Sequence, residues 1–512
     1  MQRFYGLVLC VLVASTLAKE AEAARILALM ITNFRSHYSM IQPLLKGLVS
    51  RGHEVTMVGY FPLKTPIANY TDISLEGILP PSTETMSVEE LRSYGYIKVL
   101  YLYWQFEVNL CKVAIESPQI QKLINSKNKF DLIITHLMGS DCFLVLSHHF
   151  KASLISLTTS VSLPWGNDRI GNIDHAAYIP NYFLPFADHM SFWQRLVNTV
   201  FIEAAKLGHY IFAELPTDEL MRRHFGQDVP SIFDIKRNTS LVLINSHFSL
   251  NTPRPTVPAF VEVGGIHINS QGSLPVYLEE FLNGAEHGAI YISFGTNIQS
   301  DSFPPDKLQA FIGAFSKLPQ RVLWKTSNMT GLPENIMTRK WFPQLEILRH
   351  PNTRVFITHG GQFGTLEAVY CGVPMLGIPI SYDQHLNIKT SVAKEVALHL
   401  DYEFVTEEVL LEALKKLLYE PSYRINSQKL SNQFRDRHQS PLDTALFWTE
   451  YVIKHSGAQH LRSAAVDLCW YQYLLLDVVL FFCLVFILIG VLLYYVSKAL
   501  LKSILIIKKY WH

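Results

Sequence analysis

Short apolar segments alternate with longer segments of helical periodicity through most of this chain. The apolar segments predict strands at residues 25–31, 53–60, 132–135, 154–158, 241–245, 289–294, 322–325, 355–358 and 375–378. Strands separated by helices indicate βαβ units and parallel sheets. The pattern therefore predicts an α/β protein with two facing, doubly wound, Rossmann-like domains at 24–262 and 285–465. The segment between them, 263–284, contains the Gly, Asn, Ser and Pro typical of an exposed linker.

Two further apolar segments lie near the ends of the chain. Arg3 precedes an apolar run at 4–18, and the small residues Ala21 and Ala23 follow it, which predicts a cleavable secretory signal over residues 1–23. Residues 478–496 include no charged residue, and at about 1.5 Å per residue they can cross a hydrocarbon layer of roughly 30 Å. A buried core helix would carry more polar or helix-breaking residues. We expect a transmembrane helix at 474–496.

The charges beside that helix predict the orientation of the chain in a membrane. The tail at 497–512 contains Lys498, Lys502, Lys508 and Lys509 but no acidic residue, so we expect a cytoplasmic basic tail. A cleaved signal followed by one span predicts a single-pass type I protein with both domains in the lumen. The final residues, KKYWH, approach the dilysine signal that retrieves membrane proteins to the endoplasmic reticulum, so we expect the endoplasmic reticulum membrane. Glycosylation sequons at Asn69, Asn238 and Asn328 agree with that compartment.

Composition limits the partners of the chain. Lys and Arg total 44 against 43 Asp and Glu, which argues against a large basic surface and therefore against nucleic acid as a partner. We expect small molecules and membrane lipid instead; whether the chain forms a homo-oligomer stays open. Between the signal and the anchor only Cys111, Cys142, Cys371 and Cys469 occur, without a CxxC motif, so neither a disulfide framework nor a zinc site is expected.

The segment at 341–384 carries the strongest chemical pattern. Its predicted strand at 355–358 is followed by His359-Gly360-Gly361 and by a helix that ends at Gly372. Glycines let a ligand approach the backbone closely, and the first N–H groups of the next helix favour an anion. In open α/β sheets, ligands bind beyond the carboxyl ends of the strands. An ordinary βα turn is the alternative, but the polar and aromatic residues around it favour a phosphate or diphosphate site.

This segment resembles the signature of the UDP-glycosyltransferases, in particular the animal microsomal UDP-glucuronosyltransferase type. Its sequence is most similar to that of the insect members. The resemblance extends over nearly the whole chain and implies a GT-B fold with a UDP-sugar as co-substrate. No other cofactor is expected. The sequence has no Asp-x-Asp pair, which disfavours a metal-held diphosphate, so no metal is expected either.

The resemblance also assigns the donor site. Its residues would be Ser293, Gly295, Thr296, Trp341, Gln344, His359, Gly361, Gly364, Glu367, Asp383 and Gln384. By this resemblance Trp341 stacks on the uracil, Gln344 holds the base or ribose, and Glu367 accepts hydrogen bonds from the ribose. The histidine and the glycines of the 359–364 segment meet the diphosphate, while Asp383 and Gln384 hold the sugar hydroxyls.

His37 is the candidate for acceptor chemistry. It is expected in the loop after the first strand, where a neutral imidazole with a reference pKa of about 6.5 can act as general base. Such a base normally needs a carboxylate to orient it. The position at which the family has its aspartate holds His136 here, so we expect Asp141, five residues later, to orient His37.

These residues predict transfer of a hexose, glucose or glucuronic acid, from a UDP-sugar to the hydroxyl of a small lipophilic alcohol or phenol, with inversion. The sequence does not decide the sugar. A sterol- or lipid-directed glucosyltransferase stays open, as does a catalytically impaired lumenal binding protein for hydrophobic molecules, which the departures at Lys325, Phe363 and His136 favour. Apolar segments at 101–106 and 193–212 fit the acceptor pocket, the membrane or the core.

Overall fold

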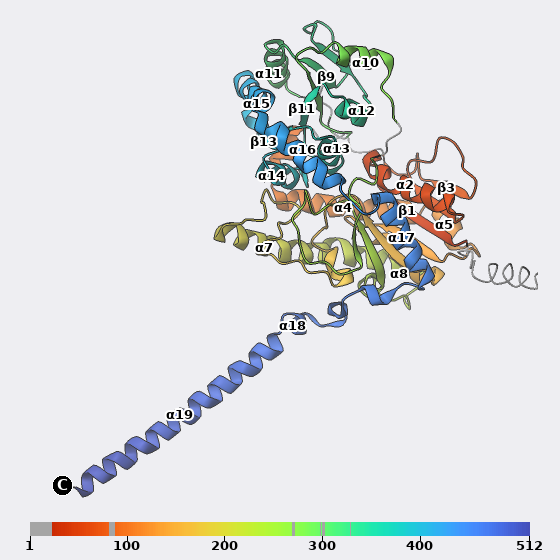
Figure 1. Ribbon diagram of the computed structural model, residues 1–512. Coiled ribbons are helices and arrows are strands. Elements are labelled where there is room, and N and C mark those ends of the chain that lie inside the picture. The colour runs from red at the N-terminus through yellow and green to blue at the C-terminus, as the bar shows by residue number, and fades with distance from the viewer. Residues whose placement is uncertain are drawn as a thin grey trace, which may run out of the picture. The chain divides into compact units, whose positions relative to one another are not determined.

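The computed structural model describes residues 23–80, 88–268, 272–296, 298, 303–327 and 329–511. Most of the predicted signal peptide, residues 1–22, and the sequon residue Asn328 lie outside this part of the chain. The chain forms two compact units, Met1–Arg462 and Ser463–His512, which are described separately (Figure 1).

The first unit contains two entirely parallel sheets. The first has seven strands in the order β3-β2-β1-β4-β5-β6-β7. Its strands are β1 (Arg25–Met30), β2 (Glu54–Gly59), β3 (Tyr70–Ser74), β4 (Leu132–His136), β5 (Ser153–Thr158), β6 (Thr239–Ile244) and β7 (Phe260–Glu262). Alternate residues of β1 belong to two different apolar clusters, one on each face of the sheet. Both faces are therefore covered by helices, as in a doubly wound fold.

The second sheet has six strands in the order β10-β9-β8-β11-β12-β13. Its strands are β8 (Ala289–Ser293), β9 (Arg321–Lys325), β10 (Ile336–Arg339), β11 (Thr353–Thr358), β12 (Met375–Gly377) and β13 (Ala397–His399). Here too the residues of β8 alternate between two apolar clusters on opposite faces. The two sheets confirm the prediction of a doubly wound α/β fold.

The helices of the first unit alternate with these strands. They are α2 (Arg35–Ser50), α3 (Val88–Ser93), α4 (Tyr96–Ile115), α5 (Pro118–Ile124), α6 (Val145–Phe150), α7 (Phe192–His209), α8 (Leu215–Phe225), α9 (Ile232–Lys236), α10 (Val276–Asn283), α11 (Pro305–Ser316), α12 (Gln344–Arg349), α13 (Gln362–Cys371), α14 (Gln384–Ala393), α15 (Glu407–Tyr419), α16 (Pro421–Arg435) and α17 (Pro441–Lys454). Among the shorter elements, η1 (Cys142–Leu144) is a 3-10 turn, and η3 (Tyr210–Glu214) is a π-helical turn.

All nine strands expected from the sequence are present, and the four that were missed share one property. β3, β7, β10 and β13 are the outermost strands of the two sheets. A central parallel strand is buried on both faces and is a continuous apolar run, whereas an edge strand is not. The edge strand β3, for example, has the sequence YTDIS and no fully buried residue. Hydrophobic pattern therefore finds the centres of these sheets and misses their edges.

Two segments depart from the expected domain plan. The 263–284 segment, expected as an exposed linker, contains helix α10, whose Leu278 and Leu282 are buried. Helix α17, expected to belong to the second domain, packs against α2 of the first sheet. Arg51 at the end of α2 donates a 2.7 Å hydrogen bond to Glu450 of α17. The chain thus returns to the first sheet before it enters the second unit.

A disulfide joins Cys111 of α4 to Cys142 of η1. The expectation that the cysteines form no disulfide was therefore wrong at this pair. The two residues are 31 positions apart, and only the packing of α4 beside η1 brings them together. Within the described residues, Cys371, Cys469 and Cys483 are free thiols.

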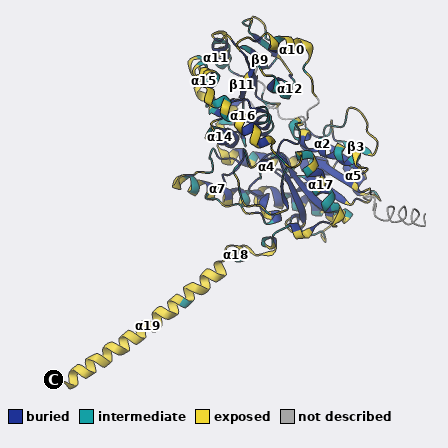
Figure 2. Cartoon of the chain, in the orientation of Figure 1, coloured by how far each residue is buried: buried dark blue, intermediate teal, exposed yellow. Residues whose placement is uncertain are grey.

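The second unit consists mainly of one long apolar helix. A short helix, α18 (Trp470–Tyr473), precedes α19 (Leu476–Tyr510), which is long and apolar enough to cross a membrane. Its side chains are exposed rather than packed in a core, as Figure 2 shows. The helix is longer than the expected span at 474–496, because the basic tail continues it as far as Tyr510.

Candidate active site

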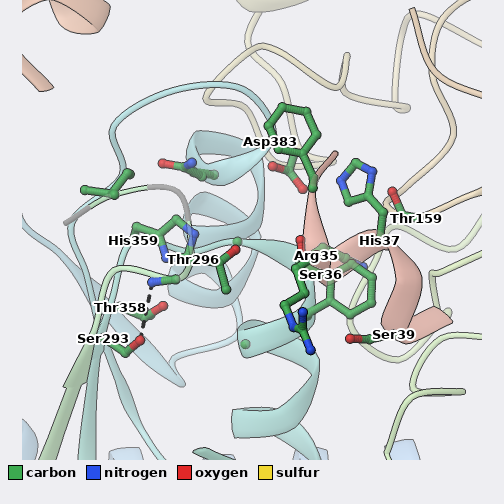
Figure 3. A pocket seen from close by; sticks show the side chains of 18 of the residues that line it. Arg35, Ser36, His37, Ser39, Thr159, Ser293, Thr296, Thr358, His359 and Asp383 are labelled. Atoms are coloured by element: carbon green, nitrogen blue, oxygen red, sulfur yellow. Dashed lines mark hydrogen bonds between the residues drawn. The ribbon is translucent and has the colours of Figure 1, made fainter. Parts of the chain in front are cut away.

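A cavity of about 910 Å³ lies between residues of both sheets in the first unit. This volume is near the upper end of the roughly 300–1,000 Å³ typical of ligand sites. With the exception of Asp141, every residue that the sequence assigned to the donor site or to acceptor chemistry lines this cavity. These are His37, Ser293, Gly295, Thr296, Trp341, Gln344, His359, Gly361, Gly364, Glu367, Asp383 and Gln384. Figure 3 shows His37 and Thr159 on one side of the cavity and His359, Thr296 and Ser293 on the other.

Helix α13 begins at the wall of this cavity without a capping side chain. Strand β11 ends at Thr358, and Gly360 then takes the left-handed conformation, with φ of +84°. Gly361 is the N-cap, and as a glycine it has no side chain to accept a hydrogen bond from the first turn. The first N–H groups of a helix have no partner within the helix and carry a partial positive charge. The start of α13 is therefore suited to an anion such as a phosphate.

The ring of His359 is held between two glycines. A Cβ atom placed on Gly295 would lie 2.7 Å from His359 Cε1, and one on Gly361 would lie 2.6 Å from His359 Nε2. Both glycines are needed to give the imidazole its place. Burial, helped by the nearby charge of Lys325, lowers the pKa of His359 from 6.5 to about 4. The imidazole is therefore neutral at physiological pH, and its buried Nδ1 has no hydrogen-bond partner within the described part of the chain.

The wall of the same cavity also includes aromatic and carboxylate side chains. Gln344 Nε2 donates a 2.6 Å hydrogen bond to Glu367 Oε2, so these two side chains form one unit. Trp341 lines the same cavity and is 69% exposed. A flat apolar face next to a carboxylate is suited to a nucleoside, because the ring can stack and the acid can accept hydrogen bonds from a ribose diol.

Asp383 and Gln384 are placed at the start of α14. Gln384 Oε1 accepts backbone hydrogen bonds from Ile380 and Ser381, at 2.8 and 3.1 Å, so this oxygen holds the preceding loop in place. Asn387 donates a 3.0 Å hydrogen bond to Asp383 Oδ2. Burial raises the pKa of Asp383 from 3.8 to about 6. A ligand hydroxyl in this part of the cavity can therefore meet a carboxylate oxygen and the Gln384 amide group.

His37 lies in the first turn of α2, not in a loop as the sequence suggested. Its side chain is partly buried in the cavity wall, and burial lowers its pKa from 6.5 to about 4. The Nδ1 atom is buried and has no hydrogen-bond partner among the residues that the structure describes. A neutral imidazole in this position can accept a proton from a hydroxyl in the cavity.

Asp141 does not make the contact with His37 that the sequence predicted. Its two carboxylate oxygens accept hydrogen bonds of 3.0 and 3.1 Å from Arg169 Nη2. The pair is buried, and Asp141 borders a separate small cavity that also includes His136 and Glu107. The ring beside His37 is that of His136, with 5.1 Å between the two ring centroids. The predicted orienting carboxylate is thus held by an arginine.

Asp141 also belongs to the one group of metal-ligand residue types found among the described residues. Its carboxylate and the side chains of His209 and Glu214 offer ligand atoms within 4.8 Å of one another. However, Arg169 forms a salt bridge with Asp141, and Lys236 forms one with Glu214. Because two cations already neutralise the two carboxylates, this group is an ion-pair network.

Sequence reasoning missed His267, which also lines the cavity. Its Nε2 atom lies 3.4 Å from Glu367 Oε1, and its ring packs against Phe363 with 4.8 Å between centroids. His267 follows β7, a strand of three residues at the edge of the first sheet. Because that strand was not recognised, the residue was assigned to a linker. The sequence feature that could have pointed to a ligand site near His267 was the Gly264-Gly265 pair before it.

Comparison with known sequences identifies relatives over most of the chain. The family model described as "UDP-glucoronosyl and UDP-glucosyl transferase" matches residues 26–509. "UDP-glycosyltransferase UGT5" of Dactylopius coccus is 42% identical and covers 91% of this chain and 90% of its own length. "UDP-glucuronosyltransferase 2B15" of Homo sapiens is 32% identical and covers 87% of this chain and 88% of its own.

Solved structures confirm the fold. The glycosyltransferase VinC, solved in complex with DTDP, has a TM-score of 0.56 at 15% identity and covers 85% of this chain and all of its own. The glycosyltransferase of kitacinnamycin has a TM-score of 0.54 at 18% identity, over 84% and 99% of the two chains. The two parallel sheets therefore form the GT-B fold that the sequence predicted.

Proposed function

The chain belongs to the UDP-glucoronosyl and UDP-glucosyl transferase family, and we propose that it transfers a hexose to the hydroxyl of a small lipophilic acceptor, with inversion. UDP-glycosyltransferase activity is the property of the family; the acceptor class and the base are our proposal. One observation carries it: a single cavity brings together the glycine-capped start of α13, the Gln344–Glu367 pair and His37.

The donor fits the second sheet with its diphosphate at the start of α13. Backbone N–H groups and the neutral His359 would donate hydrogen bonds to it, and Trp341 and Glu367 would hold the uridine. Fixed donors of this kind also stabilise the charge that develops on the UDP leaving group, which is the largest contribution in many enzymes.

The acceptor hydroxyl fits between the donor and His37. The neutral imidazole takes the hydroxyl proton while the oxygen attacks the anomeric carbon. The bond from that carbon to UDP breaks on the opposite face, so the configuration inverts and no covalent enzyme intermediate forms. A positioned general base contributes roughly 10²- to 10⁴-fold to the rate.

We further propose that the hexose is neutral, with glucose preferred to glucuronic acid. A glucuronate carboxylate beside Asp383 would be repelled by its negative charge. Of the two Lys or Arg residues that line the cavity, Lys325 donates to the Gly295 carbonyl at 2.6 Å, and the Arg35 guanidinium lies 5.2 Å from the ring centre of Phe61. A relative at 39% identity is named "UDP-glucosyltransferase 2".

We also propose the endoplasmic reticulum lumen as the location of the first unit, with α19 as the membrane anchor. Two sequon residues, Asn69 and Asn238, are exposed and accessible to glycosylation. Microsomes that contain the chain test this: protease should remove only the C-terminal tail, and glycosidase should reduce the mass of the chain after the membrane is opened.

Donor preference tests the function directly. The full-length chain in microsomes is incubated with labelled UDP-glucose or labelled UDP-glucuronic acid and a set of phenols and lipophilic alcohols. Transfer at least tenfold faster from UDP-glucose supports the proposal, and faster transfer from UDP-glucuronic acid contradicts the choice of sugar. UDP binding without transfer to any acceptor would instead support a binding protein on the same fold.

A further inference from the structure

His267 is a buried polar residue of the cavity that the proposed mechanism does not use. It follows β7 and lines the cavity, and its side chain is only 5% exposed. Neither of its ring nitrogens forms a hydrogen bond within the described part of the chain. Burying a polar group without a partner costs free energy, and each such group in a native protein calls for an explanation. A role in ligand binding would account for this one.

The turn that carries His267 is held in place through its backbone. The N–H group of Gly264 donates a 3.0 Å hydrogen bond to the Ser246 carbonyl, and a Cβ atom at Gly264 would lie 2.5 Å from that oxygen. Gly265 takes the left-handed conformation, with φ of +89°, and its N–H group donates to Asn245 Oδ1 at 3.2 Å. None of these contacts involves the imidazole. A substitution of His267 should therefore change the ring without moving the turn.

Asn245 also positions helix α13 against this turn. Gln362, the first residue of α13, is buried, and its Nε2 atom donates a 2.6 Å hydrogen bond to the Asn245 carbonyl oxygen. Glu367 lies on the same helix, five residues later. The imidazole of His267 and the carboxylate of Glu367 are thus both placed by contacts of one buried residue. As a result, His267 Nε2 lies 3.4 Å from Glu367 Oε1.

The carboxylate of Glu367 lies between two nitrogen atoms. Gln344 Nε2 donates to its Oε2 atom at 2.6 Å, while His267 Nε2 is the nitrogen beside its Oε1 atom. Phe363, one turn before Glu367 on α13, packs against the imidazole with 4.8 Å between ring centroids and so restricts its rotation. A carboxylate has about four acceptor positions on its two oxygens. With one position on each oxygen turned toward a protein nitrogen, one on each remains for two neighbouring hydroxyls.

We propose that His267 is a positioning residue that makes the donor site selective for ribose over 2′-deoxyribose. Its Nε2–H group donates to Glu367 Oε1 when the nucleotide binds, and the carboxylate is then fixed at both oxygens. Each oxygen accepts one hydrogen bond from the vicinal 2′- and 3′-hydroxyls. A deoxyribose leaves one oxygen without its hydroxyl, and a site built to bind a hydroxyl strongly rejects an analogue that lacks it. This inference rests on the proposed function, in which Glu367 holds the ribose.

Nucleotide binding to the full-length chain in detergent micelles tests this proposal. Isothermal titration compares UDP with 2′-deoxy-UDP, and circular dichroism confirms that each variant is folded. We expect the unchanged chain to bind UDP at least tenfold more tightly than 2′-deoxy-UDP. His267→Leu removes the nitrogen donor at similar size and should reduce this ratio below threefold, with less than a threefold change in the affinity for 2′-deoxy-UDP. His267→Gln keeps a nitrogen donor near the place of Nε2 and should keep the ratio above fivefold.

A matched control and the ratio of the two affinities separate this role from a general structural one. His350→Leu makes the same change at a histidine that does not line the cavity, and it should leave the ratio within twofold of the unchanged chain. A tenfold ratio retained in His267→Leu, an equal loss of affinity for both nucleotides, or equal binding of both by the unchanged chain would overturn this inference alone. Absence of UDP binding by the unchanged chain would overturn the proposed function as well.

Discussion

The imidazole rings of His37 and His136 lie edge to face, with 5.1 Å between their centroids and an interplanar angle of 63°. Burial lowers the pKa of both rings. Within the described residues no carboxylate hydrogen-bonds to His37, because Asp141, the residue expected in that role, is held by Arg169. If His37 is the base, it works with a neighbouring imidazole where related chemistry commonly uses an aspartate.

The low pKa of His37 predicts activity at unusually acidic pH. A histidine whose pKa is depressed to about 4 stays neutral above that value and loses its basic form only as the pH falls through it. With saturating UDP-sugar, kcat/KM for the acceptor should stay nearly constant from pH 7 to pH 5 and fall below pH 5. Circular dichroism at each pH controls for unfolding. A half-maximal rate near pH 6.5 would show that the environment of His37 differs from this structure.

A carboxylate at position 136 should raise the pKa of His37. His136→Asp places a negative charge beside the imidazole, and an opposite charge within about 4–6 Å shifts a pKa by roughly one to three units. We expect the acidic limb of kcat/KM to move upward by at least one unit. His136→Asn has the same size without the charge and should leave the limb in place. Equal shifts in both variants would mean that packing, not charge, determines the pKa of His37.

The Asp141–Arg169 pair should matter for stability more than for chemistry. Arg169→Met leaves a buried carboxylate unpaired, which typically costs about 3–5 kcal/mol. Asp141→Leu combined with Arg169→Met removes both charges and should recover most of that loss, as measured by denaturant unfolding. The double variant should keep kcat within about threefold. A loss of a hundredfold in kcat with a stable fold would instead show that Asp141 supports the base, as the sequence suggested.

Glu367 should contribute to UDP affinity through its charge. Glu367→Gln removes the negative acceptor for the ribose hydroxyls, and hydrogen bonds to charged groups contribute about 1.5–3 kcal/mol. Isothermal titration should show UDP affinity reduced by one to two orders of magnitude. Glu346→Gln makes the same change at another acid that lines the cavity, and it should alter the affinity less than threefold. Similar losses in both variants would argue against a specific ribose contact.

The sequence was sufficient for features that depend on local pattern. Central strands such as β4 and β11 are mostly buried and apolar, so their positions were correct to within about two residues. The residues after strand ends were also informative, since the carboxyl ends of parallel strands meet at one edge. His359 was expected at the ligand site for this reason, whereas the family resemblance assigned Glu367 and Asp383 to it; all three line one cavity.

Features that depend on which distant segments meet could not be obtained this way. The Cys111–Cys142 bond requires α4 to pack beside η1, and the Asp141–Arg169 pair joins the residue before η1 to a 3-10 turn at Asn167–Ile170. The edge strand β7 is too short for its pattern to be seen, and His267 was missed with it. The return of α17 to the first sheet is likewise a tertiary contact. None of these features produces a periodic pattern of apolar and polar residues in the sequence.

The proposed function depends on His37 acting on an acceptor beside a bound UDP-sugar. The most direct test measures kcat and the UDP dissociation constant of the same His37→Ala preparation in the full-length chain. We predict that kcat falls by at least a hundredfold, as expected when a general base is removed, while UDP affinity changes less than threefold. Retention of kcat within tenfold, or loss of UDP binding in parallel with activity, would contradict the account.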